Sequence, residues 1–525
     1  MIRQFSTVGG FTLLSRVTGF LRDIMLAAIL GAGPVADAFF VALRLPNHFR
    51  AIFAEGAFNA AFIPAYTRVR GVNGADAAKL FADRVFVLLL ASQIVLLAVA
   101  LAFTPFVIGL LAPGFSKDPG RFTLAVELTR ITFPYLLLVS IVTLYGGILN
   151  ALGRFASAAA APIFLNLSMM MTLALAAFFP SAGHAAAWGV LIAGILEALL
   201  VGGDALRQGV LPKLRWPTFD GEIVTFFKRF GPAVVGSAGT QIALFADTII
   251  ASFLAAGAVS ALYYADRLNQ LPIGVIGIAA GTVLLPEMAR RIAAGDERGA
   301  QDSQNRAVEL TLLLTVPCLV AFLLVPDLIM RALFGRGAFT AANAAAAGAT
   351  LMAYAIGLLP FVLMRSATVT FQARGDTITP VKALFAAVIV NVALKILLMD
   401  RFAQVGLAFA TSIGGWVNLA LLYWFATRQK LIVIDTRLRS SLGKLVIAGI
   451  ALTVALYAAN LLLARISVSW PFRDELTLLA LAVVGLVVYG GAILVLFRRQ
   501  WRSLLRRRGA GAPTQPAGPP ADPLI

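Results

Sequence analysis

Seven charged side chains crowd a stretch of the chain that is otherwise apolar enough to lie in a bilayer. This stretch, residues 15–62, reads SRVTGFLRD, then ADAFFVALRLPNHFR, then AIFAEGAFNAAF, and its charged members are Arg16, Arg22, Asp23, Asp37, Arg44, Arg50 and Glu55. One charge near the centre of a membrane costs about 2.5–3.5 kcal/mol on insertion scales. Because seven charges cannot all face lipid at this cost, we expect them to contact one another or water inside the protein.

These charges allow two interpretations. Opposite charges could simply pair and lock two helices together, or the stretch could line a water-filled cavity with positive walls that holds an anion. The basic members outnumber the acidic ones, and a lock needs no surplus, so the pattern favours the cavity. Gly19 and Pro46 lie among the charged residues and predict helix bends, which would turn the charged side chains towards one space. Arginine suits a phosphate because its planar fork donates two parallel hydrogen bonds and keeps its charge.

The composition decides the class of protein. The chain has 525 residues, of which 60% are hydrophobic and 13% are charged, which predicts an all-α integral membrane protein with many spans. We count fourteen apolar stretches of membrane length, at 8–30, 34–64, 85–111, 126–151, 158–179, 186–204, 231–255, 259–285, 308–330, 344–370, 381–399, 404–426, 444–464 and 475–497. Between spans six and seven, the segment 220–230, DGEIVTFFKRF, is typical of an amphipathic helix at the membrane surface.

The basic residues predict the orientation. Of the 43 Lys and Arg residues, 28 fall on the side of the N-terminus, 7 on the opposite side and 8 within spans. Because positive residues collect in the cytoplasm, we expect both termini there. The net charge of +18 is thus a topology signal with some affinity for anionic membrane lipids, and a nucleic-acid partner is not expected.

An internal repeat predicts two lobes. Residues 23–33, DIMLAAILGAG, match residues 247–257, DTIIASFLAAG, at five of eleven positions. Two parallel six-helix lobes around a central cationic cleft follow from this repeat, with substrate expected between them. We divide the chain into an N-lobe (1–215), an interfacial helix with the C-lobe (216–430), a pair of added helices with a basic end (431–508) and a disordered tail (509–525).

The second lobe adds intramembrane charges of its own, of which Arg267 would face the arginines of the first lobe. Its other charged residues are Asp247, Asp266, Glu287, Arg365 and Lys395, while the roles of Arg365, Glu197 and Asp204 stay open at this point. With one cysteine and two histidines, no transition-metal site is expected. Because the chain also lacks a Gly-rich phosphate loop and a nucleophile elbow, we expect a transporter and not an enzyme.

Several motifs resemble the MurJ (MviN) family of the MOP exporter superfamily. They are SRVTGFLRD, ADAFF, LPN, FAEGAF, PGF (113–115), TFPY (132–135), NALGRF (150–155), YYADRL (263–268) and TPVK (379–382). The resemblance implies a V-shaped lipid II flippase in the bacterial cytoplasmic membrane, which carries the undecaprenyl-diphosphate-linked precursor of peptidoglycan to the outer leaflet by alternating access. It also implies a monomer, with cell-wall synthesis proteins as possible associates, and a groove for the polyprenyl tail on the last two helices.

The resemblance assigns roles to individual residues. It implies essential arginines at Arg16, Arg22, Arg50 and Arg267 and an essential acid at Asp37. We predict substrate contacts from these residues and from Asp23, Arg44 and Glu55, with room for a chloride or another anion in the cleft.

The sequence departs from the family at one place. Some members hold a sodium ion with carboxylates, and Asp247 and Asn391 fit that pattern here, but Lys395 stands where an acid is expected. We therefore predict that Lys395 pairs with Asp247 in place of the ion, which argues against sodium coupling. The membrane potential is an alternative driving force, since 100 mV is worth about 2.3 kcal/mol per charge.

Three other functions compete with this assignment. The first is a drug or polysaccharide-repeat exporter of the same superfamily, of which a drug exporter should have twelve spans and fewer arginines in its cleft. A glycan-polymerising membrane enzyme should carry a carboxylate on a sizeable extracytoplasmic loop, and the loops here are short. A membrane scaffold would leave the intramembrane charges without a purpose.

Overall fold

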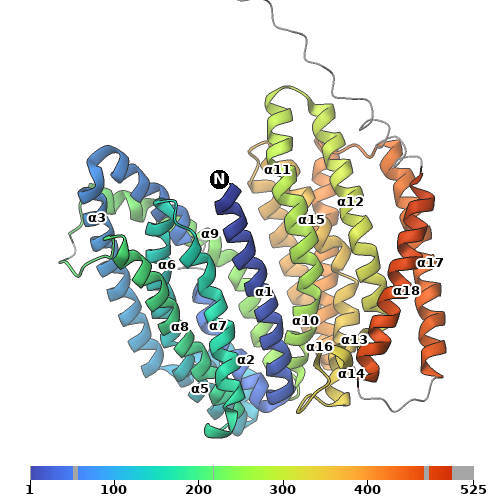
Figure 1. Cartoon of the computed structure of the whole chain (residues 1–525), viewed down its shortest axis with the longest axis horizontal. Coiled ribbons are helices and arrows are strands. Elements are labelled where there is room, and N and C mark those ends of the chain that lie inside the picture. Colours follow the sequence, from blue (N-terminus) through green and yellow to red (C-terminus); the bar gives the residue numbers. More distant parts are fainter. Residues whose placement is uncertain (1, 51–56, 217, 466–471, 499–525) are drawn as a thin grey trace, which may run out of the picture.

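The protein is a bundle of helices arranged as two groups that diverge from one end of the molecule (Figure 1). The structure, a computed structural model, describes residues 2–50, 57–216, 218–465 and 472–498. Within these ranges the chain forms helices and no strand. The N-terminus of helix α1 lies at the end where the ribbons diverge, which we call the open end; the opposite end is the closed end.

The first group of helices, the N-lobe, ends at residue 207. It contains α1 (Ile2–Leu30), α2 (Pro34–Phe49), α3 (Ala57–Ala102), α4 (Thr104–Leu111), α5 (Pro119–Thr132), α6 (Pro134–Ala151), α7 (Ala156–Ala174) and α8 (Ala182–Arg207). Proline begins α2, α5 and α6, where its missing N–H leaves no helical hydrogen bond unmade. Helix α1 runs continuously through Gly19, where we expected a bend.

The second group, the C-lobe, follows a non-helical connection. It contains α9 (Gly221–Ser252), α10 (Ala258–Pro272), the π-turn η4 (Ile273–Gly277), α11 (Ile278–Ala293), α12 (Glu297–Leu324), α13 (Pro326–Phe334), α14 (Ala341–Ala355), α15 (Leu358–Gln372) and α16 (Ile378–Arg428). Helix α16 holds two expected spans, which are separated at Ala403 by a backbone with φ 45°. Helices α17 (Thr436–Ala464) and α18 (Arg473–Leu496) complete the described chain.

Ten helices of the described chain, counting adjoining ones together, are long and apolar enough to cross a membrane. This finding makes the chain a multi-pass membrane protein. The count of fourteen spans and the six-plus-six arrangement stay predictions, because charges interrupt stretches such as α1 and because α16 runs through two of the expected spans.

The segment that we expected to lie on the membrane surface belongs to a longer helix. Residues 221–230 form the first turns of α9, where Ile223 and Phe226 are buried against α3. Asp220 caps this helix through the Ile223 N–H and pairs with Arg84 of α3, while Glu222 pairs with Arg68. The segment is thus continuous with α9 and packs part of its apolar side on the N-lobe, while Val224 and Phe227 stay exposed; its place at the membrane surface stays a prediction.

Helices α17 and α18 are fastened to the C-lobe near both of their ends. At one end, Arg331 Nε of α13 lies 3.1 Å from an Asp474 oxygen, and Arg336 Nη2 lies 2.9 Å from Glu475. At the other end, Arg306 of α12 pairs with Asp435, and the Ser441 hydroxyl donates to Glu309 at 2.6 Å. The two helices are therefore held by the C-lobe at two separated points.

Candidate functional site: a closed seam and an arginine cluster between the lobes

Asp37 lies in the contact between the lobes at the closed end. Its carboxylate is fully buried and accepts hydrogen bonds from the Gly257 N–H (2.7 Å), the Ser260 N–H (2.8 Å) and the Ser260 hydroxyl (2.6 Å), where α10 begins. Arg121 Nη1 lies 3.3 Å away. A carboxylate suits this place because the N-terminus of a helix presents unpaired N–H groups and partial positive charge. Asp37 thus joins the lobes and does not face the open space where we expected it.

Small residues let the backbones of the two lobes touch around Asp37. A Cβ added at Gly257 would lie 2.9 Å from the Ala32 carbonyl oxygen, and one at Gly31 would lie 2.6 Å from the Ala338 oxygen. The Ala338 N–H donates to the Ala28 oxygen at 2.7 Å, and the Gly114 N–H donates to the Ser252 hydroxyl at 3.0 Å. We call this set of contacts, including Asp37, the seam.

A second group of charges, the arginine cluster, forms around Asp23. This carboxylate is fully buried and accepts from Arg22 Nε (3.1 Å), from Arg22 Nη2 (2.7 Å) and from the Tyr263 hydroxyl (3.2 Å). Arg267 of the C-lobe pairs with its other oxygen. Arg22 also donates from Nη1 to Asn166 at 3.0 Å, so both arginines are held in fixed positions by their neighbours.

Arg16 completes the arginine cluster about two turns nearer the open end. Its Nη1 lies 2.9 Å from the place that a Cβ at Gly274 would occupy, so the guanidinium of Arg16 lies close to the backbone of the opposite lobe. Three guanidinium groups then face one carboxylate, Asp23, and two positive charges are in excess. An excess of this size is suited to binding a multivalent anion.

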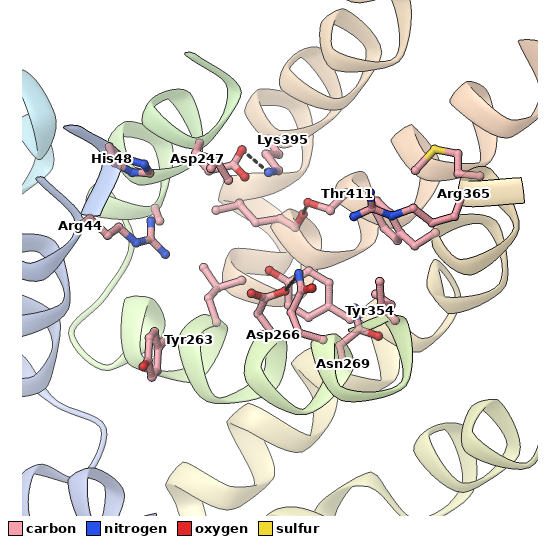
Figure 2. A pocket seen from close by; sticks show the side chains of 18 residues that line it. Arg44, His48, Asp247, Tyr263, Asp266, Asn269, Tyr354, Arg365, Lys395 and Thr411 are labelled. Atoms are coloured by element: carbon pink, nitrogen blue, oxygen red, sulfur yellow. Dashed lines mark hydrogen bonds and ion pairs between the residues drawn. The ribbon is translucent and has the colours of Figure 1, made fainter. Parts of the chain in front are cut away.

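A central cavity of about 510 Å³ lies beside the arginine cluster and shares Tyr263 with it (Figure 2). Arg44 enters this cavity from α2 and donates from Nη1 to the Thr248 hydroxyl at 2.7 Å. Lys395 hydrogen bonds to Asp247 there, which confirms the predicted contact (Figure 2). Asn391 does not join this pair, because it packs against Gly414 and its Oδ1 is buried without a partner in the described chain.

Arg50, which we expected in the central cleft, lies in another part of the N-lobe. Arg50 lines a separate cavity of about 320 Å³ inside the N-lobe, together with Glu197, Asn59 and Asn150. Glu55 lies outside the described residues. Asp204 accepts from the Ser157 hydroxyl at 2.7 Å and belongs to the packing between α7 and α8.

Four residues that the sequence analysis passed over contribute to these sites. Asn166 and Tyr263 fix the arginine cluster, Arg121 supports Asp37, and His48 lines the central cavity with its Nδ1 2.8 Å from the Gln241 amide oxygen. Tyr263 belongs to the YYADRL motif, so the sequence did contain an indication that this residue matters. In the described chain no group of three His, Cys, Asp or Glu residues could hold a metal ion.

The fold is similar to those of two solved membrane transporters. A solved structure described as a lipid II flippase MurJ in an inward closed conformation matches with a TM-score of 0.80 and 23% identity, over 94% of this chain and 99% of the other. An inward-facing multidrug transporter of the MATE family matches with a TM-score of 0.66 and 14% identity, over 81% and 97% of the two chains.

Sequence comparison identifies the family. The model of the lipid II flippase MurJ family matches residues 26–494. A probable lipid II flippase MurJ of Rhizobium meliloti (strain 1021) is 40% identical over 98% of this chain and 97% of its own length. A lipid II flippase MurJ of Burkholderia cenocepacia is 33% identical over 81% and 83% of the two chains. The chain belongs to the lipid II flippase MurJ family, whose members are transporters and not enzymes.

Proposed function

We propose that the protein carries lipid II from the inner to the outer leaflet of the bacterial cytoplasmic membrane by alternating access. The observation that supports this most directly is the arginine cluster, in which Arg22 of one lobe and Arg267 of the other hold the same carboxylate. An anion bound there contacts both lobes, so its binding energy acts on their relative position. The excess of basic residues on the N-terminal side supports a cytoplasmic open end.

The diphosphate of the substrate binds to Arg16, Arg22 and Arg267. The Arg267 side chain is 40% exposed, and its ion pair with Asp23 engages Nε, so its terminal nitrogens can donate to phosphate oxygens. Asp23 orients the two arginines and does not itself touch the anion. A chloride or another small anion takes the same place when substrate is absent. Arg44 extends the positive surface into the central cavity, and Asp37 keeps the far end closed while substrate enters.

Transport proceeds by rocking of the two lobes. The seam opens as the open end closes, and the head group then faces the other side of the membrane. We propose that the membrane potential drives this cycle, because the arginine cluster carries more net positive charge when it returns without substrate than when it crosses with the diphosphate bound. Vesicles with an imposed potential, negative inside, should therefore flip faster than vesicles at zero potential. Equal rates would contradict this coupling.

The decisive experiment asks which leaflet holds the substrate. Cells depleted of the protein should accumulate lipid II in the inner leaflet, and re-expression of the wild-type chain should reverse this. Expression of the Arg22→Ala or Arg267→Ala chain, inserted at wild-type levels, should not. An unchanged leaflet distribution after depletion would contradict the proposed function.

A second candidate function is export of another polyprenyl diphosphate-linked oligosaccharide. It is favoured by the arginine cluster itself, which recognises a diphosphate and contacts nothing specific to one sugar. Competition between lipid II and another polyprenyl diphosphate-linked glycan in vesicles separates the two. A drug or cation exporter fits less well, because the excess charge of the cluster is positive.

We also propose that the Lys395 ammonium takes the place of a sodium ion beside Asp247. The contact between the two residues supports this, since Lys395 is 2% exposed and Asp247 supplies its counter-charge. We further propose that the protein works as a monomer of fourteen spans and needs no cofactor. Any association with cell-wall synthesis proteins occurs at surfaces outside the arginine cluster.

A further inference from the structure

Two opposite charges in the central cavity take no part in the contacts described so far. Asp266 reaches the cavity from α10 and Arg365 reaches it from α15 (Figure 2). Neither side chain forms an ion pair in the described part of the chain, although both lie among other charged groups. Intramembrane charges without a protein partner are functional-site candidates, because no group within the fold compensates for placing a charge at membrane depth.

The basic residues nearest to Asp266 are engaged elsewhere. Arg267, its neighbour in sequence, turns to Asp23, and Arg44 donates to Thr248. Lys395 is taken by the other acid of the cavity, Asp247. The contact that remains for Asp266 is a long one, 3.4 Å from Gln270 Nε2. The carboxylate of Asp266 is therefore an acceptor that still needs a positive donor.

A second acceptor on the same helix points to the same ligand chemistry. Asn269 lines the central cavity, is 2% exposed, and its Oδ1 has no hydrogen-bond partner in the described chain. A buried amide oxygen without a donor is unfavourable by about 1–3 kcal/mol unless a ligand or water satisfies it. Asp266 and Asn269 together are suited to a primary ammonium group, which carries three donors and one positive charge.

Arg365 offers the complementary charge. The aliphatic part of its side chain packs on η4 and the start of α11, with Cγ 3.4 Å from the place of a Cβ at Gly277 and Cβ 3.9 Å from that at Gly281. The glycines thus give the stem a flat surface to rest on, while the residue as a whole stays exposed. Its guanidinium extends into the cavity in Figure 2 and is free to take a carboxylate in the bidentate manner of arginine.

We infer that Asp266, Asn269 and Arg365 form a second binding site, which accepts a zwitterionic amino-acid group on the peptide part of the transported head group. The ammonium binds to Asp266 with help from Asn269, and the carboxylate binds to Arg365. The volume of about 510 Å³ is suited to such a group, whereas a bare metal ion needs far less space. The inference rests on the proposed function, because it assigns a further part of the same substrate to a further part of the same cleft.

The test measures binding of three lipid probes to the purified full-length chain in nanodiscs. The first probe is lipid II with diaminopimelate in its peptide, which carries a free ammonium and a free carboxylate at the end of that side chain. The second is the same lipid with the amine acetylated, and the third contains lysine and so lacks the carboxylate. We expect the wild type to bind the first probe about tenfold more tightly than either of the others. A tenfold difference in affinity corresponds to the charge-assisted hydrogen bond that each of the other two probes cannot form.

The variants separate the two halves of the site. Asp266→Asn should lose the preference against the acetylated probe and keep that against the lysine probe, whereas Arg365→Gln should do the reverse. The exposed pair Asp302→Asn and Arg298→Gln are matched controls on α12 and should keep both preferences. Equal binding of all three probes by the wild type would overturn the inference and leave the proposed function standing. No binding of any probe would overturn both, and the wild-type comparison decides even if a variant does not fold.

Discussion

The seam and the central cavity are two parts of one interface between the lobes. The polar groups of the seam have protein partners, whereas several polar groups of the cavity have none in the described chain. In the seam, Asp37 receives three short hydrogen bonds and the backbones touch through glycines. In the central cavity, Asp266 and Arg365 have no ion-pair partner in the described chain, and Asn269 lacks a donor. The seam is therefore satisfied by the protein alone, whereas the cavity and the adjoining arginine cluster need a ligand. In alternating access the two ends of the interface do not open at the same time. We therefore expect the contacts of the seam to break during transport and contacts between the substrate and the cavity to form.

The largest effect should come from removing the arginines that hold the ligand. Arg22→Ala and Arg267→Ala each remove charge-assisted hydrogen bonds worth about 1.5–3 kcal/mol, so we expect flipping in vesicles to fall by about 10- to 100-fold. Arg298→Ala removes an exposed arginine and should not change the rate. Normal flipping by either cluster variant would show that the excess charge is not used for transport.

The next effect concerns the seam. Asp37→Ala leaves Arg121 and the N–H groups of Gly257 and Ser260 without their acceptor, which should disfavour the closed end by about 3–5 kcal/mol. Ser252→Cys in a Cys318→Ser background reports on this, because Ser252 is fully buried in the seam. Labelling by an impermeant thiol reagent from outside should rise in Asp37→Ala. It should stay low when the exposed Asp400 is replaced by alanine.

A smaller change tests whether backbone contact matters in the seam. Gly257 (φ 91°, ψ −16°) has a left-handed backbone, and Gly74 (φ 88°, ψ 175°) has another positive-φ backbone that only glycine adopts readily, so alanine strains both by about 1–3 kcal/mol. At Gly257 the new methyl also meets the Ala32 carbonyl oxygen, whereas no atom lies within 4 Å at Gly74. Gly257→Ala should therefore raise labelling of Ser252→Cys, while Gly74→Ala should only lower the melting temperature. Equal labelling in the two variants would mean that the glycine is needed for its conformation alone.

The last prediction concerns the ion pair of the cavity, where the two partners differ in burial. The Asp247 side chain is 29% exposed and that of Lys395 is 3% exposed. Asp247→Ala leaves a buried ammonium unpaired and should destabilise the protein more than Lys395→Ala, as measured by thermal unfolding. Replacing potassium by sodium should not change the wild-type melting temperature. Stabilisation by sodium that survives Lys395→Ala and disappears in Asp247→Ala would contradict the proposed replacement of the ion.

The sequence predicted the helical membrane class, because composition alone determines it, and the contact between Lys395 and Asp247, because the family resemblance placed the lysine beside that acid. The arrangement around Asp23 could not be predicted, since Arg267 joins it from 244 positions along the chain. The same limit explains Asp37, which we expected to contact substrate although its partners lie at the start of α10. The burial of the first turns of α9 was missed because periodicity shows an apolar face and not what covers it.

The attachment of α17 and α18 bears on the lipid tail of the substrate. Since ion pairs hold these helices to α12 and α13 near both ends, they must rotate together with the C-lobe, to which Arg267 also belongs. A hydrocarbon chain lying along α17 and α18 would therefore keep its distance from Arg267 throughout the cycle. The pyrophosphate could cross the membrane without stretching the link to its anchor, and the N-lobe alone would move relative to the bound lipid.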